Sequence, residues 1–217
     1  MKNVAIITGD LVDSTKMTAE ERTDMLQLLQ SLPECMSPIC KTNIEIFRGD
    51  GFQLKITEPN HALQIALAIR AIIRANKFKN NNGQWDARIA IGIGTLDYET
   101  DSLSTSDGEA FRLSGRSLDL IGNSRLIIET HWEEVNKELM VSTLFADDVV
   151  SSWTTSQSRI MFEKLVKNRS QEEIGNKLGV TRQMVSKTLK AAKEILISVY
   201  INRFEELINE RMIWERQ

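Results

Sequence analysis

Residues 171–190, QEEIGNKLGVTRQMVSKTLK, contain the pattern that decides the fold of the C-terminal part of the chain. Ile174 and Leu178 place two apolar side chains one helical turn apart, and Val185 and Leu189 repeat this spacing further along. Polar and small residues separate the two pairs. The segment therefore predicts two short helices that turn their apolar sides toward the same core.

The residues that flank and join these two helices fit one arrangement. Gly179 permits the positive φ of a tight turn, and Gly175 is small enough for a point where two steeply crossed helices touch. Ser170 and Glu173 form the pattern of a capping box, and Thr181 can cap the second helix. We therefore expect a helix-turn-helix that binds DNA. An ordinary helical hairpin is the alternative.

The second helix leaves a polar face opposite its apolar one. Arg182 and Gln183 lie at its N-terminal end, where side chains reach base edges, and Arg suits guanine as Gln suits adenine. The lysines, the threonine hydroxyl and the glutamine of the first helix are better placed for phosphates, although an exposed lysine without a partner is an equal alternative. The predicted DNA-binding residues are Gln171, Thr181, Arg182, Gln183, Ser186, Lys187 and Lys190.

Charge is distributed unevenly along the 217 residues. Residues 157–193 hold nine Lys or Arg and three Glu, a local charge of +6, whereas the whole chain carries −3, so the remainder carries −9. A basic segment on an acidic body is expected when only one part of a protein meets DNA phosphates.

Composition places the chain among globular proteins, because 41% of its residues are apolar and 26% are charged. We expect a cytoplasmic protein, since the first residues carry too short an apolar run for a signal peptide and no run is long enough to span a membrane. Cys35 and Cys40, with only His61 and His131 elsewhere, support neither a disulfide framework nor a zinc site.

The N-terminal part alternates strand and helix patterns. Strands are expected over residues 4–8, 43–47, 52–56, 87–93 and 125–129, and helices over residues 18–32, 61–76 and 111–121. Pro33 is expected to end the first helix, and only helical patterns follow Trp132. This order predicts an α+β layer, an antiparallel or mixed sheet with helices on one face, for which a ferredoxin-like palm is the natural candidate.

Two predicted domains follow from these patterns. Residues 1–130 form the α+β domain, residues 131–157 a helical connector, and residues 158–217 an all-α helix-turn-helix domain with a C-terminal helix. The stretch 151–158, SSWTTSQS, has the composition of a linker. Residues 192–214 continue as a long amphipathic helix that either caps the helix-turn-helix core or pairs with another chain.

Two aspartates follow strand patterns in the N-terminal part. Asp10 ends the first strand, and Asp50 lies in the hairpin tip at residues 48–51. These positions are neighbours in a palm-type sheet, and paired carboxylates suit Mg²⁺. Ser14 and Thr15 precede a helix, where hydroxyls and free N–H groups can cradle a triphosphate. The alternative is that each aspartate merely forms a turn or a cap.

Four segments resemble a known family. ITGDLVDST (7–15) and RGDGFQLKI (48–56) look like the two metal-binding segments of class III nucleotide cyclases, ARIAIGIGT (87–95) like their core strand, and GEAFRLSGRSLD (108–119) like the helix that carries transition-state residues. With the C-terminal helix-turn-helix, the chain is similar to the SatD family. The resemblance implies a nucleotide cyclase-like, phosphate-binding domain, possible use of Mg²⁺ and a homodimer.

The sequence also departs from the cyclase pattern. Arg112 stands where cyclases have an asparagine, whereas Arg116 keeps their arginine, and the base-recognition positions hold Ile46 and Thr105. The resemblance therefore implies a phosphate-binding set without standard cyclic nucleotide synthesis. That set comprises Ser14, Thr15, Arg48, Arg112 and Arg116. The alternative is that the arginine pair is solvated at the surface or forms a salt bridge with Asp107 or Glu109.

These patterns predict a DNA-binding transcriptional regulator whose cyclase-like domain binds a nucleotide or another phosphorylated ligand and supports dimerisation. The alternative is an active Mg²⁺-dependent nucleotide cyclase or related enzyme with an accessory DNA-binding module. Residues 177–196 also look like the promoter-reading helices of a sigma factor, but such factors precede them with an all-helical domain, and this N-terminal half is rich in strands.

Overall fold

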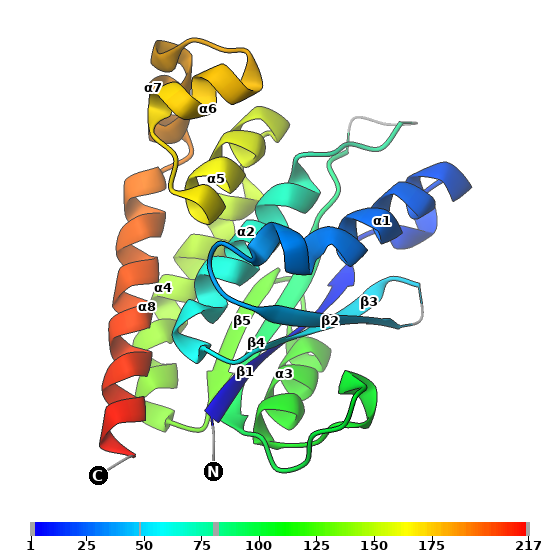
Figure 1. Ribbon diagram of the computed structural model, residues 1–217, viewed down its shortest axis with the longest axis vertical. Coiled ribbons are helices and arrows are strands. Elements are labelled where there is room, and N and C mark those ends of the chain that lie inside the picture. The colour runs from blue at the N-terminus through cyan, green and yellow to red at the C-terminus, as the bar shows by residue number, and fades with distance from the viewer. Residues whose placement is uncertain (1–2, 48, 80–82, 216–217) are drawn as a thin grey trace.

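The computed structural model describes residues 3–47, 49–79 and 83–215. Its strands form one mixed sheet in the order β2-β3-β1-β4-β5 (Figure 1). The strands are β1 (Asn3–Leu11), β2 (Thr42–Phe47), β3 (Gly51–Ile56), β4 (Ala87–Thr95) and β5 (Leu126–Thr130). All neighbours pair antiparallel except β4 and β5, which are parallel.

The first four strands alternate with two helices, α1 (Ala19–Met36) and α2 (Ala62–Arg74). The chain order is strand, helix, strand, strand, helix, strand, and β1 lies between β3 and β4 in the sheet. This connectivity is the ferredoxin-like arrangement. The predicted α+β layer with a mixed sheet is therefore confirmed.

The prediction that the helices lie on one face of the sheet is wrong. Ile7 of β1 belongs to the large core that also contains apolar residues of α1 and α2, whereas its neighbour Ile6 packs with Phe111 of α3 (Glu109–Leu120). Successive strand residues point to opposite faces, so α3 covers the other side. The parallel pairing of β4 with β5 requires a crossover between them, and α3 is that crossover.

The first helix begins as predicted and ends later. Thr18 and Glu21 form the capping box, in which the Thr18 hydroxyl accepts from the Glu21 N–H. The helix does not stop before Pro33 but continues to Met36. A proline inside a helix removes a backbone hydrogen bond and costs about 3 kcal/mol. Burial of Leu32 and Met36 on either side of it offsets this cost.

The rest of the described chain is helical. It contains α4 (Glu133–Ser151), α5 (Thr155–Lys167), α6 (Gln171–Leu178), α7 (Arg182–Ala191) and α8 (Glu194–Trp214). In Figure 1, α8 runs beside α4, and α6 and α7 lie at one end of the molecule, away from the sheet. Among the described residues, no helix combines the length and apolar character that crossing a bilayer requires.

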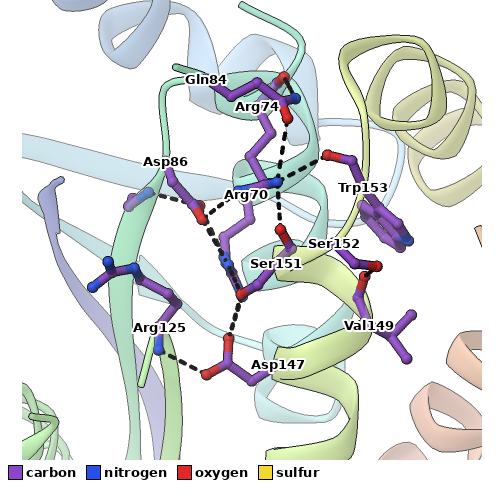
Figure 2. Close-up of polar contacts among 11 residues, drawn as sticks. Arg70, Arg74, Gln84, Asp86, Arg125, Asp147, Val149, Ser151, Ser152 and Trp153 are labelled. Atoms are coloured by element: carbon purple, nitrogen blue, oxygen red, sulfur yellow. Dashed lines mark hydrogen bonds and ion pairs between the residues drawn. The ribbon is translucent and has the colours of Figure 1, made fainter. Parts of the chain in front are cut away.

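Two buried arginines of α2 join the sheet to the later helices (Figure 2). Arg70 donates to both carboxylate oxygens of Asp86, at 3.1 and 2.8 Å, and to Asp147 of α4 at 2.7 Å. Arg74 donates to Asp86 at 2.7 Å and to the Trp153 carbonyl at 2.8 Å. Burial alone would raise the pKa of Asp86, but the arginines outweigh it and hold that pKa below its ordinary value.

The connection between α4 and α5 is packed against this arginine cluster. Trp153 is buried, and its indole N–H donates to the Ala192 carbonyl, just after α7, at 2.9 Å. Thr154 caps α5. The stretch 151–158, with its linker-like composition, thus includes a core residue. The predicted domain boundaries stay a prediction, while one cluster of buried side chains extends from β1 to α8.

Candidate functional site

The caps predicted for α6 and α7 are confirmed. The Ser170 hydroxyl accepts from the Glu173 N–H at 3.2 Å, and the Glu173 carboxylate accepts from the Ser170 N–H at 2.7 Å. These hydrogen bonds lower the pKa of Glu173. Thr181 accepts from the Met184 N–H at 3.2 Å. Both helices therefore begin where the sequence predicts, since these side chains satisfy N–H groups that the helix leaves free.

The turn and the apolar side of the pair also match the prediction. Gly179 has a φ of 69°, in the left-handed region. A Cβ on Gly175 would lie 2.7 Å from the Val180 carbonyl oxygen, so the close approach at this point excludes a larger residue. Ile174 and Val185 are fully buried, whereas Leu178 is only partly buried against the same core. Two helices joined by a tight turn occupy the predicted segment.

The side of α7 opposite its buried residues gathers most of the predicted DNA-binding side chains. Together with Gln171, which begins α6, they line one hollow of about 410 Å³. We call this set of residues the α7 polar face. Its members are Gln171, Arg182, Gln183, Ser186, Lys187 and Lys190. Within residues 3–47, 49–79 and 83–215, no side-chain hydrogen bond or ion pair engages any of them. The seventh predicted residue, Thr181, caps α7 beside this face.

Other basic residues of the same segment are engaged inside the protein. Glu163 of α5 is buried, and its two carboxylate oxygens bind Arg169 and Lys177. These two cations hold the start and the end of α6 against α5. The positive charge counted along the sequence therefore divides into a pair that fastens the helices and a set that faces solvent.

The structure brings the two predicted metal-binding segments together. Asp10 pairs with Gly51 across β1 and β3, and the Leu11 N–H donates to the Asp50 carbonyl at 3.1 Å. Ser14 donates its hydroxyl proton to the Asp50 carboxylate at 2.8 Å. We call Asp10, Asp50 and Ser14 the aspartate site.

The carboxylate of Asp10 is paired with Arg88 of β4. The two residues are cross-strand partners, and the guanidinium binds both carboxylate oxygens, with Nε 2.8 Å from Oδ1. This hydrogen bond raises the pKa of Arg88. As arranged, the aspartate site does not fit Mg²⁺, because the ion would first have to displace a bidentate guanidinium. Among the described residues, no three His, Cys, Asp or Glu side chains cluster as ion ligands.

The predicted phosphate-binding residues are not assembled as one free group. Arg112 is bound to Asp97 at 3.0 Å and to Asp107. The pair with Asp107 is the salt bridge that the sequence offered as an alternative. The Thr95 hydroxyl and Arg112 together lower the pKa of Asp97. Arg116 and Thr15 are exposed, and no side-chain partner engages either of them within the described ranges. Arg48 lies outside the described residues.

Comparison with known proteins leaves the family open. No family model matches the chain, and no curated protein matches it. Among solved structures, the active GGEEF domain of a diguanylate cyclase from Vibrio cholerae is similar, with 13% identity over 61% of this chain and 85% of that one and a TM-score of 0.44. A likeness of this size assigns neither an activity nor a ligand. The similarity to the SatD family stays a prediction from the sequence.

Sequence reasoning missed Arg88 and Glu163. Each offers a signal in hindsight: Arg88 is the only charged residue in the strand ARIAIGIGT, and Glu163 is the only acidic residue in the helix TSQSRIMFEKLVK. A lone charge in an otherwise apolar element usually has an opposite partner nearby. The partner itself could not be named without the strand register and the helix packing.

Proposed function

We propose that this protein binds DNA through α6 and α7 and acts as a sequence-specific regulator. The observation that carries the proposal is the α7 polar face: six polar or basic side chains share one hollow, and no partner within the described residues engages them. On the opposite side of α7, buried Val185 and Leu189 fix the rotation of the helix. The polar side chains are therefore held outward by packing rather than drawn into the protein.

The dimensions and chemistry of this face suit the major groove. An α-helix with its side chains is about 10–12 Å across, and the major groove is about 12 Å wide. Arg182 and Gln183, in the first turn of α7, are assigned to base edges. Lys187 and Lys190, one and two turns further along, are assigned to phosphates, which position the helix without reading sequence. Gln171 of α6 is assigned to the backbone as well.

The other predicted roles have less support. Binding of a nucleotide or phosphorylated ligand would use Arg112, which is held by two aspartates, and Mg²⁺-dependent turnover would use Asp10, which is held by Arg88. We therefore propose neither a ligand nor a reaction for the α+β part. Both remain predictions from the sequence.

The proposal is tested by selecting preferred sequences from random duplex DNA and measuring their affinity by fluorescence anisotropy. A side chain that pairs with one base supplies about 1–3 kcal/mol of discrimination. We expect the double variant Arg182→Ala, Gln183→Ala to raise the Kd for a selected duplex about 10- to 100-fold. Arg116→Ala, which removes an exposed arginine from α3, is the matched control and leaves the Kd unchanged. Absence of any selected sequence would refute the proposal.

A further inference from the structure

An apolar face lies on α4 and α8. Apart from Ile213 and Trp214 at the C-terminal end of α8, seven large apolar side chains of these helices are exposed to between 54% and 73% of their full surface. They are Met140, Val141, Leu144 and Phe145 of α4, and Ile195, Leu196 and Val199 of α8. We call them the α4–α8 apolar face. Apolar side chains of this size are normally buried, so their gathering on two helices indicates an interaction site.

The two helices bring these residues onto one continuous surface. Glu138 binds Arg203 at 2.8 Å, and the hydroxyls of Thr143 and Tyr200 lie 2.5 Å apart. A higher residue number on α4 therefore faces a lower one on α8, as in an antiparallel pair. One turn from the Glu138–Arg203 pair, this register sets Val141 at the level of Val199, and a further turn sets Phe145 at the level of Leu196.

The size of the face matches an interface between proteins. At exposures of 54% to 73%, the seven side chains present roughly 700 Å² of apolar surface, whereas the largest patch on a typical monomer is roughly 300–600 Å² and a standard interface buries about 800 Å² per partner. The face is therefore larger than a monomer ordinarily leaves exposed.

The charges bordering the face are compatible with a copy of itself. Arg203 is paired with Glu138 and Glu206, and Lys137 is paired with Glu133. In a two-fold interface the same patch meets itself, so an excess of one charge would repel. With Glu134, Glu194, Lys190 and Lys193 also present, the border carries both charges in similar numbers, and no such excess arises.

The face also adjoins the α7 polar face. A hollow of about 480 Å³ is lined by Ser186 and Lys190 of α7 together with Ile195 and Leu196 of α8. A two-fold axis that runs along α4 and α8 would set the α7 helices of two chains close to each other and on the same side. Proteins that read DNA with a pair of such helices use dimers whose symmetry matches paired half-sites.

We propose that the α4–α8 apolar face is where a second copy of this chain packs across a two-fold axis, with Phe145 and Leu196 at its centre. The placement of two α7 helices rests on the proposed DNA-binding function, whereas the contact itself rests only on the apolar face. The residues of the aspartate site are not among those that form the face.

Sedimentation equilibrium of the full chain over a range of micromolar concentrations tests the contact. We expect wild type to sediment as twice its 24.7 kDa mass and Phe145→Asp to weaken the dimer at least about 100-fold, because the substitution buries a charge at the centre of the interface. Phe145 is exposed, so the variant keeps its fold, which circular dichroism verifies. Tyr98→Asp changes another exposed aromatic residue, far from these helices in sequence, and leaves the dimer intact.

A second pair of variants asks whether the face meets itself. Mixing Phe145→Asp with Phe145→Lys chains should restore the dimer that each lacks alone, because opposite charges then face each other. A monomeric wild type, or a dimer indifferent to Phe145→Asp, would overturn the inference. So would a monomer that instead binds phosphatidylglycerol vesicles through this face. If wild type is dimeric but selects no DNA sequence, the proposed function fails and the contact stands.

Discussion

The α7 polar face and the aspartate site both contain charged side chains, but only those of the aspartate site already have partners. At the aspartate site, Asp10 is bound by Arg88 and Asp50 by Ser14. On the α7 polar face, Arg182 and Lys187 have no side-chain partner within the described chain. Each group of residues resembles a binding site in the sequence. In the structure, only the α7 polar face has charges that are available to another molecule.

This difference shows that a charged motif should be judged by the partners that its side chains already have in the structure. An engaged charge contributes to stability and resists recruitment by a ligand, whereas a free charge contributes little to stability and much to association. Substitutions of the two kinds should therefore separate cleanly. Engaged residues should change unfolding and spare DNA binding, and free residues should do the reverse.

The largest effect is expected where an engaged charge is fully buried. Asp86→Asn should lower the free energy of unfolding by about 3–5 kcal/mol at pH 7, because Arg70 and Arg74 lose their shared carboxylate. Urea unfolding measures this loss, and Asp148→Asn, an exposed residue of α4, is the control. DNA affinity of the folded variant should be unchanged; a variant that folds normally but binds DNA poorly would break the separation.

The loss of stability in Asp86→Asn should also depend on pH. The folded state lowers the pKa of Asp86, so its carboxylate stabilises the protein above the ordinary aspartate pKa of about 4, and this contribution is lost as the pH falls through the lowered value. The gap in unfolding free energy between wild type and Asp86→Asn should therefore narrow in acid. A gap that stays constant from pH 7 to strongly acidic solution would contradict the ion-pair account.

A smaller effect is expected at the aspartate site. Arg88→Ala should cost about 1–2 kcal/mol, since the pair is only partly buried. It also leaves the Asp10 carboxylate without its cationic partner. We expect Mg²⁺ or Mn²⁺ to raise the melting temperature of Arg88→Ala and to leave that of wild type unchanged. Stabilisation of wild type by either ion, lost in Asp10→Asn, would show that the metal displaces Arg88 and would contradict our view of this site.

A free charge should give the opposite result. Lys190→Ala should weaken DNA binding several-fold and reduce the slope of log K against log salt by about one, since each phosphate contact releases about one counterion. Its free energy of unfolding should stay within about 0.5 kcal/mol of wild type. Anisotropy titrations at several salt concentrations measure the slope, and a slope equal to that of wild type would remove Lys190 from the proposed interface.

The smallest effect is expected at Arg112. Its pairs with Asp97 and Asp107 are exposed, and pairs of this kind contribute about 0.2–1 kcal/mol. Arg112→Ala should therefore change stability slightly and DNA affinity not at all. Thermal unfolding in low and high salt checks this, because screening should erase the difference. A large loss of stability that persists in high salt would mean that Arg112 has a role beyond these pairs.

Features set by neighbours in the sequence could be predicted from it. The caps at Ser170 and Thr181, the left-handed Gly179 and the buried side of α7 all depend on spacings of a few residues. The alternation of strand and helix patterns likewise predicted an α+β layer with a ferredoxin-like palm as the candidate, because short connections leave few topologies to choose from.

Features set by distant residues could not be predicted. The pairing of Arg88 with Asp10 depends on the β1–β4 register, and the placement of α3 depends on the parallel pairing of β5. The extension of α1 past Pro33 depends on a core that buries Met36. In each case a contact from elsewhere in the chain decided the outcome.

The buried arginines of α2 also limit which segments of this chain can be replaced by recombination. A chain that ended at residue 130 would keep Arg70 and Arg74 but lose Asp147 and the carbonyls of Ser151 and Trp153. A buried guanidinium without its acceptors costs several kcal/mol. Recombination that replaced the helices after the sheet would have to supply new acceptors at once, so the two halves are expected to be inherited together.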